Sequence, residues 1–188
     1  MAMSWIKLAN FALAKLGVAN ITSFGDGTKN SNAANLLYEQ SVDEVLSVHD
    51  WNCAMTRAEL DQDADTPIGD DWDYYWNLPI DPYCLRVIGL IDSDSPWLVE
   101  SRNLLCNDEE VYIKYIGRIT NPTRLPPILV DTLACHLAYK MANRITEAGS
   151  GLEVRMYSEY EAALLKARWQ DAMEQPDNDE DTLWTIRS

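Results

Sequence analysis

Residues 111–145 read VYIKYIGRITNPTRLPPILVDTLACHLAYKMANRI, and the spacing of the apolar side chains changes within this stretch. As far as residue 119 the side chains alternate in character, which is the period of a β-strand. From Pro127 onward apolar side chains recur every three or four positions, which is the period of an amphipathic helix. The helical stripe consists of Val130, Leu133, Ala134, Leu137, Met141 and Ile145. A strand followed by a long helix predicts a chain that contains both kinds of element.

The helical period also occurs toward both ends of the chain. We expect helices at 4–17, 30–49, 127–147 and 152–174. Ser4 is suited to cap the first helix, and Gly17 to end it. The short link Gly149-Ser150-Gly151 makes the last two helices antiparallel neighbours.

Between the second and third helices, residues 51–119 contain short apolar runs bounded by turn residues, which predicts a β lobe. The expected strands lie at 83–91, 96–100, 103–106 and 110–119, with 51–60 as a further candidate strand and 72–78 as an aromatic-rich run that stops at Pro79. The two-residue turns Ser101-Arg102 and Asn107-Asp108 are short enough for hairpins, so we expect an antiparallel meander. The element order predicts an α+β fold: a bundle of the N- and C-terminal helices with the meander inserted as a lobe. Residues 1–175 would form a single domain.

Residues 176–188 differ in composition from the rest of the chain. The acidic run PDNDED at 176–181 has no large apolar side chain to bury, which favours an extended linker. The run leads into a short segment with alternating apolar side chains, a pattern typical of a segment that orders against a partner. The candidate docking residues of this C-terminal tail are Leu183, Trp184, Ile186 and Arg187.

The charge balance excludes one class of function. Fifteen basic and thirty acidic side chains give a net charge of −15. A protein that grips phosphates carries the opposite sign, because Lys and Arg displace the counterions of DNA. Binding to an anionic membrane surface is disfavoured for the same reason. We also find no uninterrupted apolar run near the ~20 residues that a membrane-spanning helix needs, so we expect no membrane partner.

Aromatic and acidic side chains gather in the predicted β lobe. The chain has seven Trp and nine Tyr but only two Phe, which indicates either a Trp-rich core or surfaces buried by a partner. The candidate interface aromatics are Trp72, Tyr74, Tyr75, Trp76 and Trp97. The loop before and among them is acidic, and its residues are Asp61, Asp63, Asp65, Asp70, Asp71 and Asp73.

We expect no catalytic, cofactor or metal site, and therefore no enzyme. The four cysteines lie far apart without a CxxC pair, so buried free thiols are favoured over a zinc site. The alternating aspartates from Asp61 fail as a calcium loop, because Thr66 stands where the glycine belongs and Trp72 where the bidentate glutamate belongs. No sequence motif of a hydrolase, a nucleotide-binding loop or a zinc protease is present. The first twenty residues form an amphipathic helix rather than a signal peptide, which favours the cytoplasm.

Several stretches in order resemble one family of viral proteins. They are LAKLG at 13–17, ITSF at 21–24, HDWNCA at 49–54, LP at 78–79, CLRV at 84–87, WLVE at 97–100 and YIKYI at 112–116. The chain is similar in these stretches to the head-to-tail adaptors of short-tailed bacteriophages, the tail tubular protein A family. The resemblance extends over nearly the whole chain, and Pro82-Tyr83 interrupts it before Cys84.

The resemblance implies a virion structural protein, made in the bacterial host cytoplasm. It implies a homo-oligomeric ring, twelve copies in this family, between the portal protein and the tail nozzle protein. Genomic DNA would pass through the lumen without specific binding, repelled by the acidic loop, which would face the lumen or the nozzle. The tail would dock on the portal.

Two other interpretations stay open. The chain fits a tail completion or stopper protein of a longer-tailed phage, which is also a structural part of a virion. It also fits a small phage-encoded enzyme that acts on sugars through the acidic loop.

Overall fold

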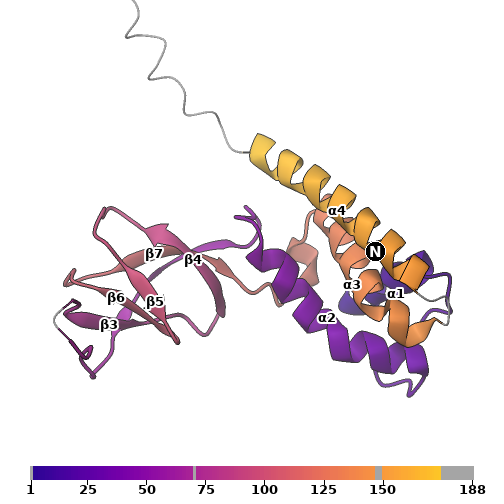
Figure 1. The fold of residues 1–188 in the computed structure, drawn as a ribbon, viewed down its shortest axis with the longest axis horizontal. Helices are drawn as coiled ribbons and strands as arrows, with labels where there is room; N and C mark the ends of the chain where they lie inside the picture. Colours follow the sequence, from indigo (N-terminus) through magenta and orange to yellow (C-terminus); the bar gives the residue numbers. More distant parts are fainter. Residues whose placement is uncertain (1, 70, 147–149, 175–188) are drawn as a thin grey trace, which may run out of the picture.

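The computed structural model describes residues 2–69, 71–146 and 150–174. Within these residues the chain has four α-helices and two antiparallel sheets, so the predicted α+β fold is confirmed. Figure 1 shows the helices on one side of the molecule and the strands on the other. The strands are inserted between the second and third helices, as the sequence predicts.

Helix α3 (Pro127–Ile145) is the centre of the helical part. It packs against α1 (Trp5–Lys15), α2 (Lys29–Ser47) and α4 (Ser150–Met173), and α4 runs along its outer side (Figure 1). Twelve of its nineteen residues are buried, so α3 is covered on more than one face. Burial by three neighbouring helices explains why the apolar stripe of this helix is so regular.

The predicted signals set the ends of the first helix. The Ser4 hydroxyl accepts the backbone N–H of Lys7 at 3.2 Å and so caps a free donor of the first turn. Gly17 follows the last turn with φ of +71°, a left-handed conformation that glycine adopts without steric cost. Helix α2 ends at Ser47, two residues before the predicted end, and His49 beyond it pairs with Asp171 of α4.

The β lobe contains two sheets rather than the predicted meander. One sheet has the order β1-β7-β4 and the other the order β2-β3-β6-β5, with antiparallel pairs throughout. The bounds are β1 Met55–Glu59, β2 Asp61–Gln62, β3 Tyr74–Asn77, β4 Cys84–Leu90, β5 Leu98–Glu100, β6 Asn103–Cys106 and β7 Tyr112–Gly117. A 3-10 helix at Pro122–Arg124 leads from the lobe to α3.

One of the two predicted hairpins is wrong. The turn at Ser101-Arg102 joins β5 to β6 as expected. Asn107-Asp108 does not join β6 to β7, because β7 lies in the other sheet between β1 and β4. Ile113 and Ile116 of β7 are both fully buried although they lie on opposite faces of the strand, which requires cover on both sides. Ile113 packs in the core of the lobe and Ile116 in the core shared with the helices, so β7 lies between two cores.

The chain enters and leaves the lobe at one place. The N–H of Gly117, at the end of β7, donates to the carbonyl of Ala54, just before β1, at 2.9 Å. Next to this crossing, helix α2 contacts strand β4. Helices and lobe therefore meet along one junction.

Candidate interaction surfaces

Two arginines of the β lobe hold the second half of helix α2. Arg118 donates from Nε to Asp43 Oδ1 at 2.9 Å and from a terminal nitrogen to the other carboxylate oxygen. Arg86 donates from Nε to the carbonyl of Ser47 at 3.0 Å and also pairs with Asp50. A two-point arginine–carboxylate contact fixes direction as well as distance. The lobe is therefore attached to α2 in a defined orientation.

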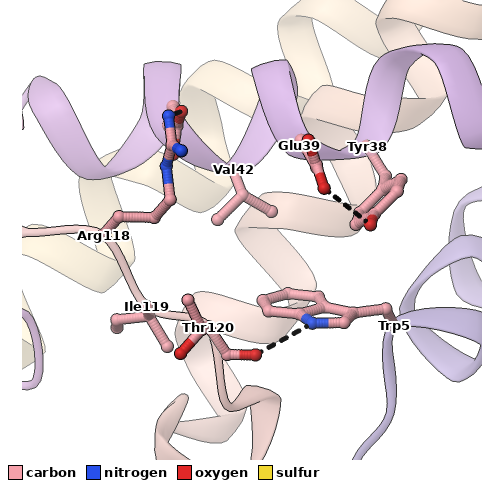
Figure 2. A pocket seen from close by; sticks show the side chains of 8 residues that line it. Trp5, Tyr38, Glu39, Val42, Arg118, Ile119 and Thr120 are labelled. Atoms are coloured by element: carbon pink, nitrogen blue, oxygen red, sulfur yellow. Dashed lines mark hydrogen bonds and ion pairs between the residues drawn. The ribbon is translucent and has the colours of Figure 1, made fainter. Parts of the chain in front are cut away.

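A pocket of about 200 Å³ lies beside this junction, and Figure 2 shows its lining residues. The indole N–H of Trp5 donates to the carbonyl of Thr120 at 3.1 Å, and the Tyr38 hydroxyl donates to Glu39 at 2.9 Å. Val42 supplies buried apolar surface. The pocket therefore has a mixed lining whose polar groups are paired with one another. Sequence reasoning did not find it, since its residues come from distant parts of the chain.

A buried polar cluster joins helices α2 and α3. Ser41 Oγ lies 2.8 Å from His136 Nδ1, and His136 Nε2 lies 3.4 Å from a carboxylate oxygen of Glu44. Lys140 also binds Glu44, at 2.7 Å. Burial lowers the pKa of His136 to about 4, so the ring is neutral at pH 7. The residue types are those of a hydrolytic triad, but Ser41 is only 1% exposed, so a substrate cannot reach its hydroxyl. The cluster stabilises the helical part.

The acidic residues of the predicted loop that the structure describes are exposed or half-buried. Asp61 belongs to strand β2, which the sequence had placed in a loop, and Asp70 lies outside the described residues. Asp63 accepts the backbone N–H of Asp65 at 3.1 Å and the side-chain amide of Asn103 at 3.2 Å. These hydrogen bonds lower the pKa of Asp63 and keep it ionised. Among residues 2–69, 71–146 and 150–174, no group of three His, Cys, Asp or Glu side chains is placed to hold a metal ion.

The candidate interface aromatics separate into two groups. Trp76 is only 4% exposed and belongs to the core of the lobe, so its interface prediction is wrong. Its position in β3 points it inward, where the ring packs edge-on against Tyr74 at 6.1 Å. Trp72, Tyr74, Tyr75 and Trp97 are half-buried. Tyr74 and Trp97 pack against the lobe core with part of each ring at the surface.

Helix α4 has an exposed apolar face that the sequence reasoning missed. Its inner face, with Met156 and Tyr160, packs as predicted. On the outer face four large apolar side chains are each about two-thirds exposed: Val154 67%, Leu165 71%, Trp169 68% and Met173 66%. Their spacing of four to eleven residues can be read from the sequence, but it was overlooked because the apolar residues of the inner face recur with the same helical period.

The four cysteines are free, with Cys84, Cys106 and Cys135 buried and Cys53 half-buried. The candidate docking residues Leu183, Trp184, Ile186 and Arg187 lie outside the described residues. No described helix is long and apolar enough to cross a membrane. The sequence matches no model of a known protein family, and no match was found among curated proteins.

Proposed function

We propose that this chain is a virion structural protein, the adaptor subunit that forms a ring between the portal and the tail nozzle of a short-tailed phage. In this proposal twelve copies surround the path of the genome. The chain is made in the host cytoplasm and performs no catalysis. The proposal starts from the sequence stretches that resemble this adaptor family and that follow one another along the chain in the same order.

The observation that carries the proposal is the distribution of exposed apolar side chains. They stand on the helical part and on the β lobe alike: Phe11, Leu36, Val48, Val154, Leu165, Trp169 and Met173 among the helices, and Ile80, Leu98, Val99 and Tyr112 on the lobe. A ring subunit needs two different faces, one for each neighbour. A contiguous exposed apolar patch, such as Leu165, Trp169 and Met173 on successive turns of α4, is typical of a surface that a partner buries.

The junction supports a mechanical role. A connector keeps its two ends in a fixed relative orientation while other components bind to each end. Arg118 and Arg86 bind the last turns of α2 at Asp43 and Ser47, and Arg86 also binds Asp50 just beyond the helix. Because these contacts are directional, they resist rotation of the lobe about the two chain crossings.

The negative charge supports a conduit for DNA. The described acidic residues of the lobe have carboxylates at or near the surface, and hydrogen bonds keep Asp63 ionised. A wall of like charge repels the phosphate backbone and prevents adhesion during ejection. Arginines would oppose this effect, but Arg118 is paired with Asp43 and Arg124 donates to the carbonyl of Cys53. Arg57 is exposed on β1.

The test is assembly with the portal protein encoded in the same genome. The full chain mixed with portal rings should form a larger ring complex, visible by electron microscopy and sedimentation. A chain lacking 176–188 should keep its circular dichroism spectrum but fail to bind. A matched control replaces the acidic residues of 177–181 with Asn and Gln and keeps Leu183, Trp184 and Ile186, and it should still bind.

Two results would contradict the proposal. If the full chain stays a small species beside intact portal rings, the adaptor function is wrong. If the truncated chain binds as well as the full chain, the docking role of the tail is wrong.

A further inference from the structure

Strand β1 has one edge that no described strand covers. It lies at the end of the sheet β1-β7-β4, so β7 pairs with only one of its two edges. Just past β1, the Leu60 N–H donates to the Val111 carbonyl at 2.9 Å, on the β7 side. Backbone groups alternate in direction along an antiparallel strand, so those of Arg57 and Glu59 point to the open edge. An open edge of this kind is a template for one further strand.

A groove of about 740 Å³ lies along this edge. Residues 56–59 form one wall and residues 78–82 the other, in which Ile80 is 81% exposed. The Tyr115 hydroxyl donates to the Pro82 carbonyl at 3.4 Å, so this second wall lies over the Tyr115 face of the sheet. Because side chains alternate along a strand, an added strand would place every second side chain against this partly apolar wall. We call this site the β1 groove.

Two cations lie beside the open edge on the other face of the sheet. Arg57 of β1 is directly opposite Lys114 of β7, which is the neighbour of Tyr115 along the strand. Arg57 is exposed and Lys114 is half-buried, and neither forms an ion pair with a described residue. Like charges directly opposite on neighbouring strands repel each other. In a chain with a net charge of −15, this pair favours an acidic occupant of the edge.

The last described residue, Glu174, lies near the start of β1. The Asn52 backbone N–H donates to the Asp171 carboxylate at 3.1 Å, and the Asn52 side chain donates to the Asp171 carbonyl at 2.8 Å. Glu174 follows Asp171 by three positions, and β1 begins three positions after Asn52. Figure 1 shows this yellow end of α4 on the side of the helical part toward the lobe. Fourteen residues follow Glu174 and span up to about 46 Å, whereas the five residues of β1 span about 17 Å.

The sequence after Glu174 alternates as the β1 groove requires. Asp177, Asp179 and Asp181 share one face of an extended strand. Trp184 and Ile186 share the opposite face. One face therefore suits the two cations, and the other suits the partly apolar wall.

The order along the chain also agrees with the groove. With Asp181 beside Arg57, Trp184 lies about three positions further along the edge. The apolar part of the second wall begins there, because Asn77, which precedes it, pairs with Asp61 just past β1. Charge and apolar contact are thus satisfied in one register, with both strands running in the same direction.

We propose that residues 177–186 of the free chain bind the β1 groove as an added strand that runs in the same direction as β1. The occupant is this chain's own C-terminal segment, because its starting point, its charge and its alternation all match the groove. A contact within one chain builds no assembly, so the inference goes beyond the proposed function and does not rest on it. For an adaptor, the groove would hold the tail until the portal competes for it.

The experiment is hydrogen exchange of the full-length free chain, followed at single amides by NMR. The amides of Arg57 and Glu59 face the open edge and donate to the added strand. They should therefore exchange at least about tenfold more slowly than in Trp184→Ala, which removes the apolar anchor. The variant should keep the circular dichroism spectrum of the original chain.

A matched pair of charge variants tests the orientation of the added strand. Asp181→Lys and Glu180→Lys make the same change in net charge at neighbouring positions, but only Asp181 faces the two cations. Asp181→Lys should speed exchange of the Glu59 amide about tenfold, and Glu180→Lys by less than about twofold. Arg57→Asp combined with Asp181→Lys should restore slow exchange, because the attraction returns with its signs exchanged.

Three outcomes would overturn the proposal. The first is equal exchange of the Arg57 and Glu59 amides in the original chain and in Trp184→Ala. The second is an effect of Glu180→Lys as large as that of Asp181→Lys. The third is protection that rises with chain concentration, which would assign the groove to the tail of a second copy. Because no portal is present, none of these results bears on the adaptor function.

Discussion

The attachment of the β lobe to helix α2 can be tested by changing Arg118 and Asp43, alone and together. The two residues are 75 positions apart in the chain, so their contact reports tertiary structure alone. The Arg118 guanidinium also lies over the ring of Tyr83, 4.7 Å from its centroid. The variants are Arg118→Ala, Asp43→Ala and the double variant. Arg118→Lys is added because lysine keeps the charge but loses the two-point contact.

The magnitude follows from geometry and exposure. The side chains are 41% and 21% exposed, so the pair is neither a freely solvated ion pair nor a fully buried one. Exposed pairs contribute about 0–1 kcal/mol, and hydrogen bonds to charged groups about 1.5–3 kcal/mol. We expect a coupling free energy of about 1.5 kcal/mol between Arg118 and Asp43. Arg118→Ala should cost about 2–3 kcal/mol, since it also removes the contact with the Tyr83 ring, worth about 0.5–1 kcal/mol. The cost of Arg118→Lys should lie between zero and the cost of Arg118→Ala.

The assay is urea unfolding followed by circular dichroism, which gives the free energy of unfolding of each variant and the coupling from the cycle. Hydrogen exchange should show that Arg118→Ala loosens the second half of α2 more than α3. The control cycle uses Arg155 and Glu159 on α4, an exposed pair at 3.6 Å, for which about 0.3–0.5 kcal/mol is expected. A coupling for Arg118 and Asp43 no larger than this control would refute a directional attachment.

Three further predictions concern the cores and the titratable groups. Trp76→Phe should change the free energy of unfolding by less than about 1 kcal/mol, because it removes a buried indole N–H that has no hydrogen-bond partner among the described residues. Trp51→Phe should cost about 2–4 kcal/mol, since the Trp51 N–H donates to the Val45 carbonyl at 2.8 Å. Urea unfolding of both variants measures the two free energies. The pKa of His136 is about 4 in the folded chain, whereas an ordinary histidine has a pKa of 6.5, so between pH 4 and 6.5 only the unfolded chain binds the proton. The folded chain should therefore lose up to about 3 kcal/mol of stability from pH 7 to 4. Unfolding experiments at several pH values should show a smaller loss for His136→Gln. Burial raises the pKa of Cys53 to about 11, so alkylation by iodoacetamide at pH 8, followed by mass spectrometry, should be about 100-fold slower than for an ordinary thiol until urea unfolds the chain.

The sequence predicted those features that depend on local patterns. The inner face of α3 follows from apolar spacing, and the cap at Ser4 and the end at Gly17 follow from single residues. Strand order did not follow, because β1 pairs with β7 across about sixty residues, with Met55 opposite Ile116. A local pattern shows that a strand exists, but its neighbours depend on which faces the rest of the chain covers.

The candidate surfaces show the same limit. Trp72, Tyr74, Tyr75 and Trp76 form one aromatic run, yet only Trp76 is buried. Alternation along β3 separates Tyr75 from Tyr74 and Trp76, but the deeper burial of Trp76 depends on how the rest of the lobe packs against that face. The outer face of α4 was hidden for another reason. A helix with apolar side chains on two opposite faces has no net amphipathic direction, so a search for one face finds the core and stops.

The insertion of the lobe connects the fold to the proposed role. Because Gly117 returns to Ala54 by a direct hydrogen bond, the lobe begins and ends at one point, and α1 to α4 can pack without regard to its outer loops. The hydrogen-bond partners of Asp63, which are the backbone of Asp65 and the side chain of Asn103, lie within the lobe, so substitutions there leave the helical core intact. Arg86 and Arg118 then fix the direction of the lobe relative to α2. In the proposed role, this arrangement would let the chain change the surface presented to DNA or to a nozzle while it keeps the surface presented to its neighbours. That separation is what a connector between two dissimilar partners requires.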